Sequence, residues 1–128
     1  KTASSDDVSY TVSGLTPGAS FKFRIKAYRN TNENGVLYSD YSDTLSVITA
    51  LSSVNGVKLG GRAADALRVN WTKNASADGY IVEIYKDGKW SRAAKITSNS
   101  TTTYRASGLK AGTVYKFRVR AYKMSGST

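Results

Sequence analysis

The chain has 128 residues, which fits one domain of ordinary size or two small ones. It carries 19 Lys and Arg against 9 Asp and Glu, a formal net charge of +10, and contains neither Cys nor His. The absence of thiol and imidazole excludes disulfides, zinc fingers, haem ligation, cysteine nucleophiles and Ser-His-Asp triads. We therefore expect no metal site and no cofactor, and a core held by the burial of its 40% hydrophobic residues.

The chain shows no targeting or membrane-spanning pattern. No apolar run approaches the roughly 20 residues that cross a bilayer, so we expect no membrane insertion. The first residues, Lys1-Thr2-Ala3-Ser4-Ser5-Asp6, do not resemble a signal peptide. A mature or excised segment is the expectation that follows.

Apolar residues recur with period two along almost the whole chain, which predicts an all-β fold. The expected strands are residues 8–12, 20–28, 45–49, 54–59, 66–72, 79–85, 90–96, 102–106 and 114–123. Turn residues separate them at Asn34-Gly35, Gly60-Gly61, Asp78-Gly79, Asp87-Gly88 and Gly126. Asp87-Gly88 is the strongest hairpin signal, because a tight primed turn requires positive φ angles. Many short strands at this spacing indicate a sandwich or barrel.

An internal repeat organises the sequence. Residues 14–28, GLTPGASFKFRIKAY, reappear as residues 108–122, GLKAGTVYKFRVRAY, with a constant offset of 94 positions. Tyr10 and Tyr104 keep that offset, so the repeat extends into the preceding strand. One repeating unit is therefore about 94 residues, and the chain holds roughly one and a third of them.

Alternation within the repeat separates a core face from a solvent face. In the second copy Phe117 and Val119 are expected to point inward, while Lys116, Arg118 and Arg120 point outward. The inward set can offset the ordering entropy of one small sandwich, because burial of each large side chain contributes roughly 1.5–3 kcal/mol.

These motifs together resemble the fibronectin type III domain, an immunoglobulin-like sandwich of seven strands lettered A, B, C, C′, E, F and G. The matching segments are residues 67–72 (LRVNWT, strand B), 79–85 (GYIVEIY, strand C) and 108–122 (the E–F corner and strand F). Residues 38–49 look like the F–G loop and strand G of such repeats in surface proteins of Gram-positive bacteria. The resemblance implies a structural core of Trp71, Tyr80, Leu109, Tyr115 and Phe117, with the Tyr115 hydroxyl bonded to backbone at the corner. The first copy has Phe21 there and loses that bond.

The resemblance divides the chain into two incomplete modules. Residues 1–50 supply strands E, F and G, and residues 51–128 supply strands A to F without strand G. Three explanations are open: an excised piece of a tandem array, completion between chains, and circular permutation within one chain. In the second, Leu45, Val47 and Thr49 of one copy provide strand G for the next and build a filament. The third is disfavoured because residues 49–54 are too short to return along a sandwich of about 33 Å.

Two surfaces are candidate binding sites. The whole excess of positive charge lies in residues 51–128, with fourteen basic and four acidic groups. A stripe of Lys116, Arg118, Arg120 and Arg68 would attract an anionic polysaccharide or cell-wall polymer, or else form a solvated strand face. Elements that could lie near this stripe carry further cations: Lys86, Lys89, Arg92 and Lys95. Trp90, Tyr85 and Tyr122 could form a platform for a sugar ring, or instead stabilise the sheet by pairing across strands. Nucleic acid is not expected as a partner, because no recognition helix and no exposed stacking cluster is evident.

No catalytic constellation is evident. The paired carboxylates are Asp6 with Asp7, Asp40 with Asp43, and Asp78 with Glu83, all at termini, turns or exposed positions without an acid or base partner. We therefore expect no enzyme. The sequence predicts a secreted or cell-surface repeat that acts as spacer, scaffold or adhesive filament, with other copies or neighbouring repeats of a longer chain as partners. The alternative is an accessory carbohydrate-binding module of a secreted glycosidase.

Overall fold

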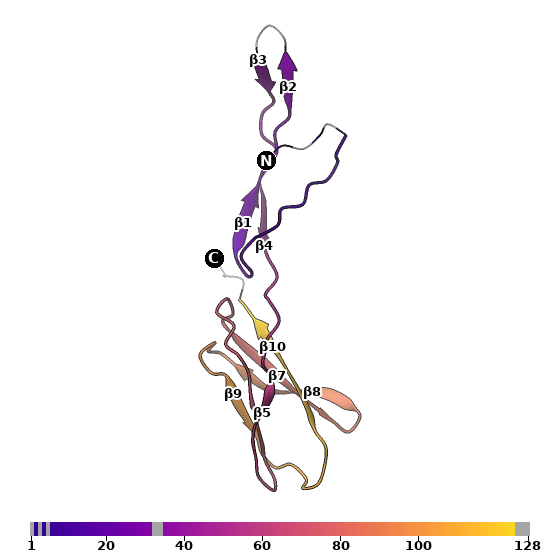
Figure 1. Ribbon diagram of the computed structural model, residues 1–128, viewed down its shortest axis with the longest axis vertical. Helices are drawn as coiled ribbons and strands as arrows, with labels where there is room; N and C mark the ends of the chain where they lie inside the picture. The colour runs from indigo at the N-terminus through magenta and orange to yellow at the C-terminus, as the bar shows by residue number, and fades with distance from the viewer. Residues whose placement is uncertain (1, 3, 5, 32–34, 125–128) are drawn as a thin grey trace. The chain divides into compact units, whose positions relative to one another are not determined.

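The chain consists of two compact units, Lys1–Thr49 and Ala50–Thr128. The computed structural model describes residues 2, 4, 6–31 and 35–124, and Figure 1 traces their path. Every element of regular structure in these residues is a β-strand. The prediction of an all-β chain is therefore confirmed for the described part. Each unit is considered by itself below.

The described residues of the second unit form six strands in two sheets. One sheet has the order β10-β7-β8 and the other β5-β6-β9, and all neighbouring strands are antiparallel. The strands are β5 (Lys58–Arg62), β6 (Leu67–Asn70), β7 (Gly79–Lys86), β8 (Lys89–Ile96), β9 (Thr103–Ala106) and β10 (Lys116–Tyr122).

One hydrophobic core joins the two sheets of the second unit. Trp71, which directly follows β6, packs edge-on against Tyr80 of β7, with ring centroids 5.3 Å apart. Val82 completes the fully buried centre, and Phe117 of β10 packs against it. The Tyr80 hydroxyl accepts a hydrogen bond from the Asn74 N–H at 2.9 Å and donates one to the Asn99 carbonyl at 3.1 Å. The buried tyrosine thus has both of its polar functions satisfied.

The hairpin between β7 and β8 follows the sequence prediction. Asp87 and Gly88 have φ angles of 52° and 79°, as a primed two-residue turn requires. Farther along, the register shifts between Val82 and Glu83, so that one residue of β8 bulges. The bulge places Lys95 opposite Ile81 on the outer face. Without it, the strict alternation of β8 would turn Lys95 toward the core.

Two predicted turns are instead parts of strands. Gly79 begins β7, where an added Cβ would lie 2.9 Å from the Tyr122 ring and even closer to the Ile96 carbonyl oxygen. Gly60 and Gly61 lie inside β5 at a register shift, and a Cβ on Gly60 would collide with the Asn70 side chain. Glycine is needed at positions 60 and 79 for close approach rather than for chain reversal.

The first unit is built from an interrupted pair of strands. β1 (Ser20–Phe23) pairs with β4 (Leu45–Ile48), and β2 (Tyr28–Thr31) pairs with β3 (Gly35–Tyr38). The single strand predicted for residues 20–28 is thus divided in two. The predicted turn at Asn34-Gly35 lies partly outside the described residues, and Gly35 itself begins β3.

The interruption is bridged by two serines in the segment 38–43, YSDYSD. The N–H of Ser42 donates to the Ile25 carbonyl at 2.8 Å, and its Oγ accepts from the Ile25 N–H at 3.0 Å. Ser39 makes the same pair of bonds with Ala27, at 3.0 and 2.9 Å. Each serine thereby takes the place of a residue in a regular ladder. Residues 38–43 therefore connect β3 to β4 along the side that faces β1 and β2, and do not form the predicted F–G loop.

Residues 8–12 form no strand, contrary to the prediction. The equivalent residues in the second unit are 102–106, most of which form β9 by pairing with β6. The described part of the first unit has no counterpart of β6, so the ladder that would hold residues 8–12 is missing. Val8 and Tyr10 are consequently exposed.

No apolar residue in the described part of the first unit is buried. Along β4, Leu45 and Ile48 retain 61% and 53% of their accessible surface. A two-stranded ribbon of this kind is marginally stable in water, because it has no second layer to pack against. All buried hydrophobic residues among those described lie in the second unit.

Replacing Tyr80 with Phe tests the buried hydroxyl. The Asn74 N–H would lose its acceptor inside the core, which lowers the free energy of unfolding by about 1–3 kcal/mol. Urea denaturation followed by tryptophan fluorescence measures the change. Tyr85→Phe is the matched control, since its ring lies on the outer face and its hydroxyl makes no hydrogen bond within the described residues. Equal stability of the two variants would contradict the assignment.

Candidate functional site

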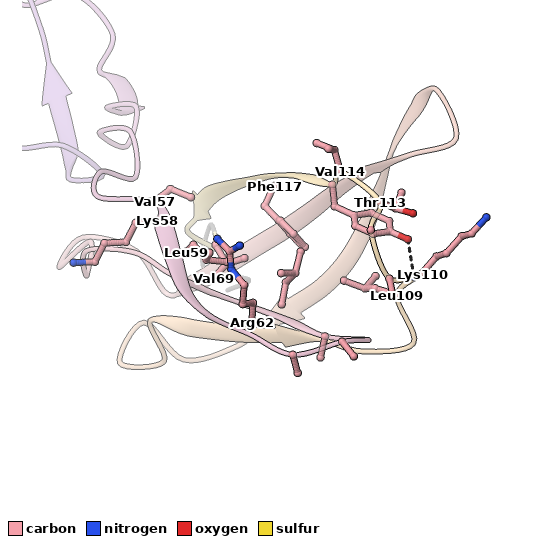
Figure 2. Close-up of a pocket in the computed structure, with 17 residues that line it drawn as sticks. Val57, Lys58, Leu59, Arg62, Val69, Leu109, Lys110, Thr113, Val114 and Phe117 are labelled. Carbon is pink, nitrogen blue, oxygen red and sulfur yellow. Dashed lines mark hydrogen bonds between the residues drawn. The ribbon is translucent and has the colours of Figure 1, made fainter.

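The outer edge of β10 has no strand partner among the described residues. Beside it lies a groove of about 560 Å³ between the two sheets, lined by β5, β10 and the segment 109–115 (Figure 2). Phe117 projects from β10 into this groove, and Leu59 of β5 lines it as well. Val114 and Leu59 keep 86% and 48% of their surface exposed. The side of the sandwich between β5 and β10 is therefore an uncovered apolar strip.

The corner that precedes β10 is fixed by two hydrogen bonds. The Tyr115 hydroxyl accepts from the Lys110 N–H at 3.0 Å, shown by the dashed line in Figure 2. The Leu109 N–H donates to the Asp65 carbonyl at 2.8 Å, which ties the corner to the other sheet. Tyr115 and Leu109 are both half-buried. This geometry is the tyrosine corner of immunoglobulin-like sandwiches.

The outer face of the sheet β10-β7-β8 carries a regular array of cations and aromatic rings, which we name the cationic face. Strand register sets it in three rows: Lys116, Tyr85 and Trp90; Arg118, Glu83 and Arg92; Arg120, Ile81 and Lys95. Tyr122 follows at the end of β10. The five cations of the face are exposed, and the aromatic side chains beneath them are half-buried.

The aromatic rings of this face support its cations. The Arg118 guanidinium lies 4.3 Å from the centroid of Trp90, and Trp90 packs against Tyr85 at 5.4 Å. Lys116 lies over Tyr85 at 5.4 Å, and Lys95 lies over Tyr122 at 5.2 Å. Such cation–π contacts limit the freedom of long side chains. The predicted sugar platform of Trp90, Tyr85 and Tyr122 therefore has cations over each of its rings, although Tyr122 lies apart from the other two.

Glu83 is the only carboxylate in the three rows. Its Oε2 accepts a hydrogen bond from Arg118 Nε at 2.6 Å. This bond, together with the nearby charges of Arg118 and Arg120, holds the pKa of Glu83 below its ordinary value, against the opposing effect of burial. Arg92 and Arg120 form no ion pair within the described residues.

The remaining predicted site residues lie elsewhere. Arg68 belongs to the other sheet, where it is opposite Arg105, so it does not join Lys116, Arg118 and Arg120 on one face. Leu45 and Val47 lie on β4, and Thr49 directly follows that strand. Arg92 and Lys95, which the sequence placed only on elements that could lie near the stripe, lie on β8 of the same sheet as Lys116, Arg118 and Arg120. Alternation places Arg92 correctly, but Lys95 depends on the bulge in β8, for which no clear sequence signal exists.

Within the described residues, no cluster of three or more Asp or Glu side chains could hold a metal ion. The same residues include no helix long and apolar enough to cross a membrane.

Two antiparallel sheets, a shared core and the tyrosine corner define the second unit as an immunoglobulin-like β-sandwich module. The chain belongs to the fibronectin type III family: the family model "Fibronectin type III domain" matches residues 52–128. Domains of this family serve as non-catalytic extracellular modules with structural or interaction roles. The expected fold class and the expected extracellular or cell-surface location are thereby confirmed.

Similar proteins carry this kind of domain as part of longer chains. Human Neogenin is 29% identical over 127 residues and rat Neogenin 31% over 130 residues, each covering 93% of this chain. The chain spans only 9% of the length of either relative. The crystal structure of rat CD45 extracellular region, domains d3–d4, superposes with a TM-score of 0.54 at 17% identity, covering 98% of this chain and 67% of that one. At this identity the likeness shows the fold alone.

The ion pair on the cationic face predicts a pH dependence. Because the folded-state pKa of Glu83 is lowered, the ionised carboxylate stabilises the fold above its ordinary pKa of about 4.5, and this contribution disappears as pH falls through the folded-state value. NMR titration should show the pKa of Glu83 below its ordinary value in the native chain, and closer to that value in the Arg118→Ser variant. The Glu83→Gln variant should have a lower free energy of unfolding than the natural chain at neutral pH. This difference should vanish in acid, where Glu83 is protonated. A Glu83 titration unaffected by Arg118→Ser would contradict this reading.

Proposed function

We propose that the chain is a spacer and scaffold module of an extracellular protein, and that its β10 edge is completed by a strand supplied by another copy. The observation that carries this proposal is the unpaired edge of β10 beside an apolar groove. Unpaired N–H and C=O groups along a strand edge are a template for pairing with another backbone. A strand added there would also cover the exposed Leu59 and Val114.

The first unit supplies the register for such a strand. In β1 and β4, Phe23 lies opposite Leu45, and Lys22 opposite Ser46. The internal repeat makes Phe23 equivalent to Phe117, and Lys22 to Lys116. A strand with the sequence of residues 45–48 would therefore place Leu45 beside Phe117 at the groove. Its alternate residue, Val47, would lie opposite Tyr115.

Thr49 offers an anchor for the end of that strand. In the first unit its carbonyl accepts from the Gly18 N–H at 3.2 Å, and its hydroxyl donates to the Thr16 carbonyl at 2.6 Å. The equivalents of Gly18 and Thr16 are Gly112 and Lys110. Within the described residues the Gly112 N–H has no partner. The corner before β10 is thus able to receive a residue such as Thr49 in the same way.

Burial favours the exchange. In its own unit β4 covers no core, and its apolar side chains remain largely exposed. Against β10, Leu45 and Val47 would enter an existing groove, and each fully buried side chain contributes roughly 1.5–3 kcal/mol. The backbone bonds broken with β1 would be replaced by equivalent bonds with β10. The net change in free energy therefore favours pairing of this strand with β10, whose sheet packs against a second sheet.

A repeat array is consistent with the comparisons, because most of both units falls within the segment matched to Neogenin. Neighbouring repeats of a longer chain are accordingly expected partners. The narrower assignment of residues 38–49 to surface repeats of Gram-positive bacteria stays a prediction, since the relatives named above are animal proteins.

Cysteine cross-linking tests the proposed register, because the natural chain has no Cys. Two single variants, Ser46→Cys and Lys116→Cys, are mixed and oxidised. Each chain then holds one thiol, so a disulfide between different variants joins two copies. We expect the Ser46–Lys116 pair to form a mixed dimer efficiently, as the homologous register places these residues opposite one another.

The matched control replaces Lys116→Cys by Ser91→Cys. Ser91 is exposed on β8, at the opposite edge of the same sheet. Cross-linking at random collisions would give equal yields for both mixtures and contradict the register. A chain that stays monomeric at all concentrations and forms no mixed disulfide would refute completion between copies.

A further inference from the structure

We propose that the cationic face of the second unit is a binding site for a linear polysaccharide that carries sulfate or phosphate groups. This inference is independent of strand completion. Completion uses the backbone edge and inward side chains of β10, whereas the cationic face uses side chains that point outward. The evidence for the site is its charge, the spacing of its cations, their support by aromatic rings, and its position on an open sheet face.

Charge on the face is concentrated and largely unneutralised. Five cations surround one carboxylate, Glu83, which leaves four net positive charges on the outer face of the sheet. Glu83 is bonded to Arg118 alone. Arg92 and Arg120, on opposite sides of β7, have no ion-pair partner within the described residues. A cluster of this density attracts polyanions and releases their counterions on binding.

The spacing of the cations suits a repeating anion. Lys116, Arg118 and Arg120 occupy alternate positions of β10, so their attachment points are about 7 Å apart. Arg92 and Lys95 form a second line on β8, roughly 10 Å across the sheet. The face therefore presents two parallel rows of cations to an extended chain. Guanidinium groups bind the oxygens of sulfate and phosphate through paired hydrogen bonds.

The aromatic rings beneath the face make it preorganised. Arg118, Lys116 and Lys95 each lie over a ring at 4.3–5.4 Å, which reduces the side-chain entropy lost when an anion binds. The first unit has similar contacts, because Arg24 and Lys26 each lie 3.7 Å from a tyrosine ring. Arg24 and Lys26 are the equivalents of Arg118 and Arg120. Support by an aromatic ring thus recurs in both copies for Arg24 and Arg118, whereas Arg120 lies over no ring within the described residues.

The form of the surface favours a polysaccharide over other polyanions. None of the five cations lines the groove of Figure 2, so the anion would lie across an open sheet rather than enter a cavity. Single-stranded nucleic acid depends on free aromatic faces for base stacking. Here Trp90, Tyr85 and Tyr122 already stack with cations.

The test compares two double variants of the full chain that remove the same charge. Arg92→Ser with Arg120→Ser removes the two unpaired cations of the face. Arg68→Ser with Arg105→Ser removes two exposed arginines that lie opposite one another on the other sheet. Binding to dextran sulfate and to uncharged dextran is measured by calorimetry from low to physiological salt.

We expect the first double variant to weaken dextran sulfate binding about tenfold and to reduce the slope of log affinity against log salt by about two. The control pair should change the affinity less than threefold, and uncharged dextran should not bind. Equal losses in both double variants would show attraction by net charge alone and overturn the site. Tighter binding of single-stranded DNA than of dextran sulfate would overturn the polysaccharide assignment.

Discussion

Each β-strand has two edges, and the backbone groups on both edges need hydrogen-bond partners. β10 meets this requirement on one side only, through β7. The same strand supplies Phe117 to the core and Arg118 to the outer face, so the core packing, the groove and the cationic face all depend on how it is held. The tyrosine corner fixes where β10 begins. The Tyr115 hydroxyl accepts a hydrogen bond from the Lys110 N–H, and the Leu109 N–H donates to the Asp65 carbonyl.

The internal repeat places one sequence in two surroundings and separates local from tertiary causes. In the first unit the segment is divided into β1 and β2, and serines bridge the gap. In the second unit the equivalent segment becomes the continuous strand β10, because β7 offers it a regular ladder over seven residues. The cation that stacks on Tyr41 in one copy, Arg24, has its equivalent Arg118 on Trp90 in the other. Local sequence thus fixes alternation, and the neighbouring strand decides continuity and contacts.

Alternation and turn chemistry made much of this architecture predictable. The Asp87-Gly88 hairpin and the inward direction of Phe117 followed from period two and from positive φ angles. The failures share a cause: they depend on residues distant in sequence. Residues 8–12 lack a partner strand. Position 79 requires glycine because the Ile96 carbonyl and the Tyr122 ring leave no room for a Cβ. Arg68 lies on the other sheet because strand order, not charge pattern, determines its position. The bulge that turns Lys95 outward likewise arises from the fit between β7 and β8.

Amide hydrogen exchange along β10 is the most direct measure of whether its free edge is filled. Alternate N–H groups of this strand point toward β7, and the others point toward the open side. The account predicts that the first set is protected at every protein concentration, whereas the second exchanges quickly in dilute solution and becomes protected as concentration rises. Slow exchange of both sets in a dilute, monomeric sample would mean that the edge is already covered within one chain, and would contradict the account.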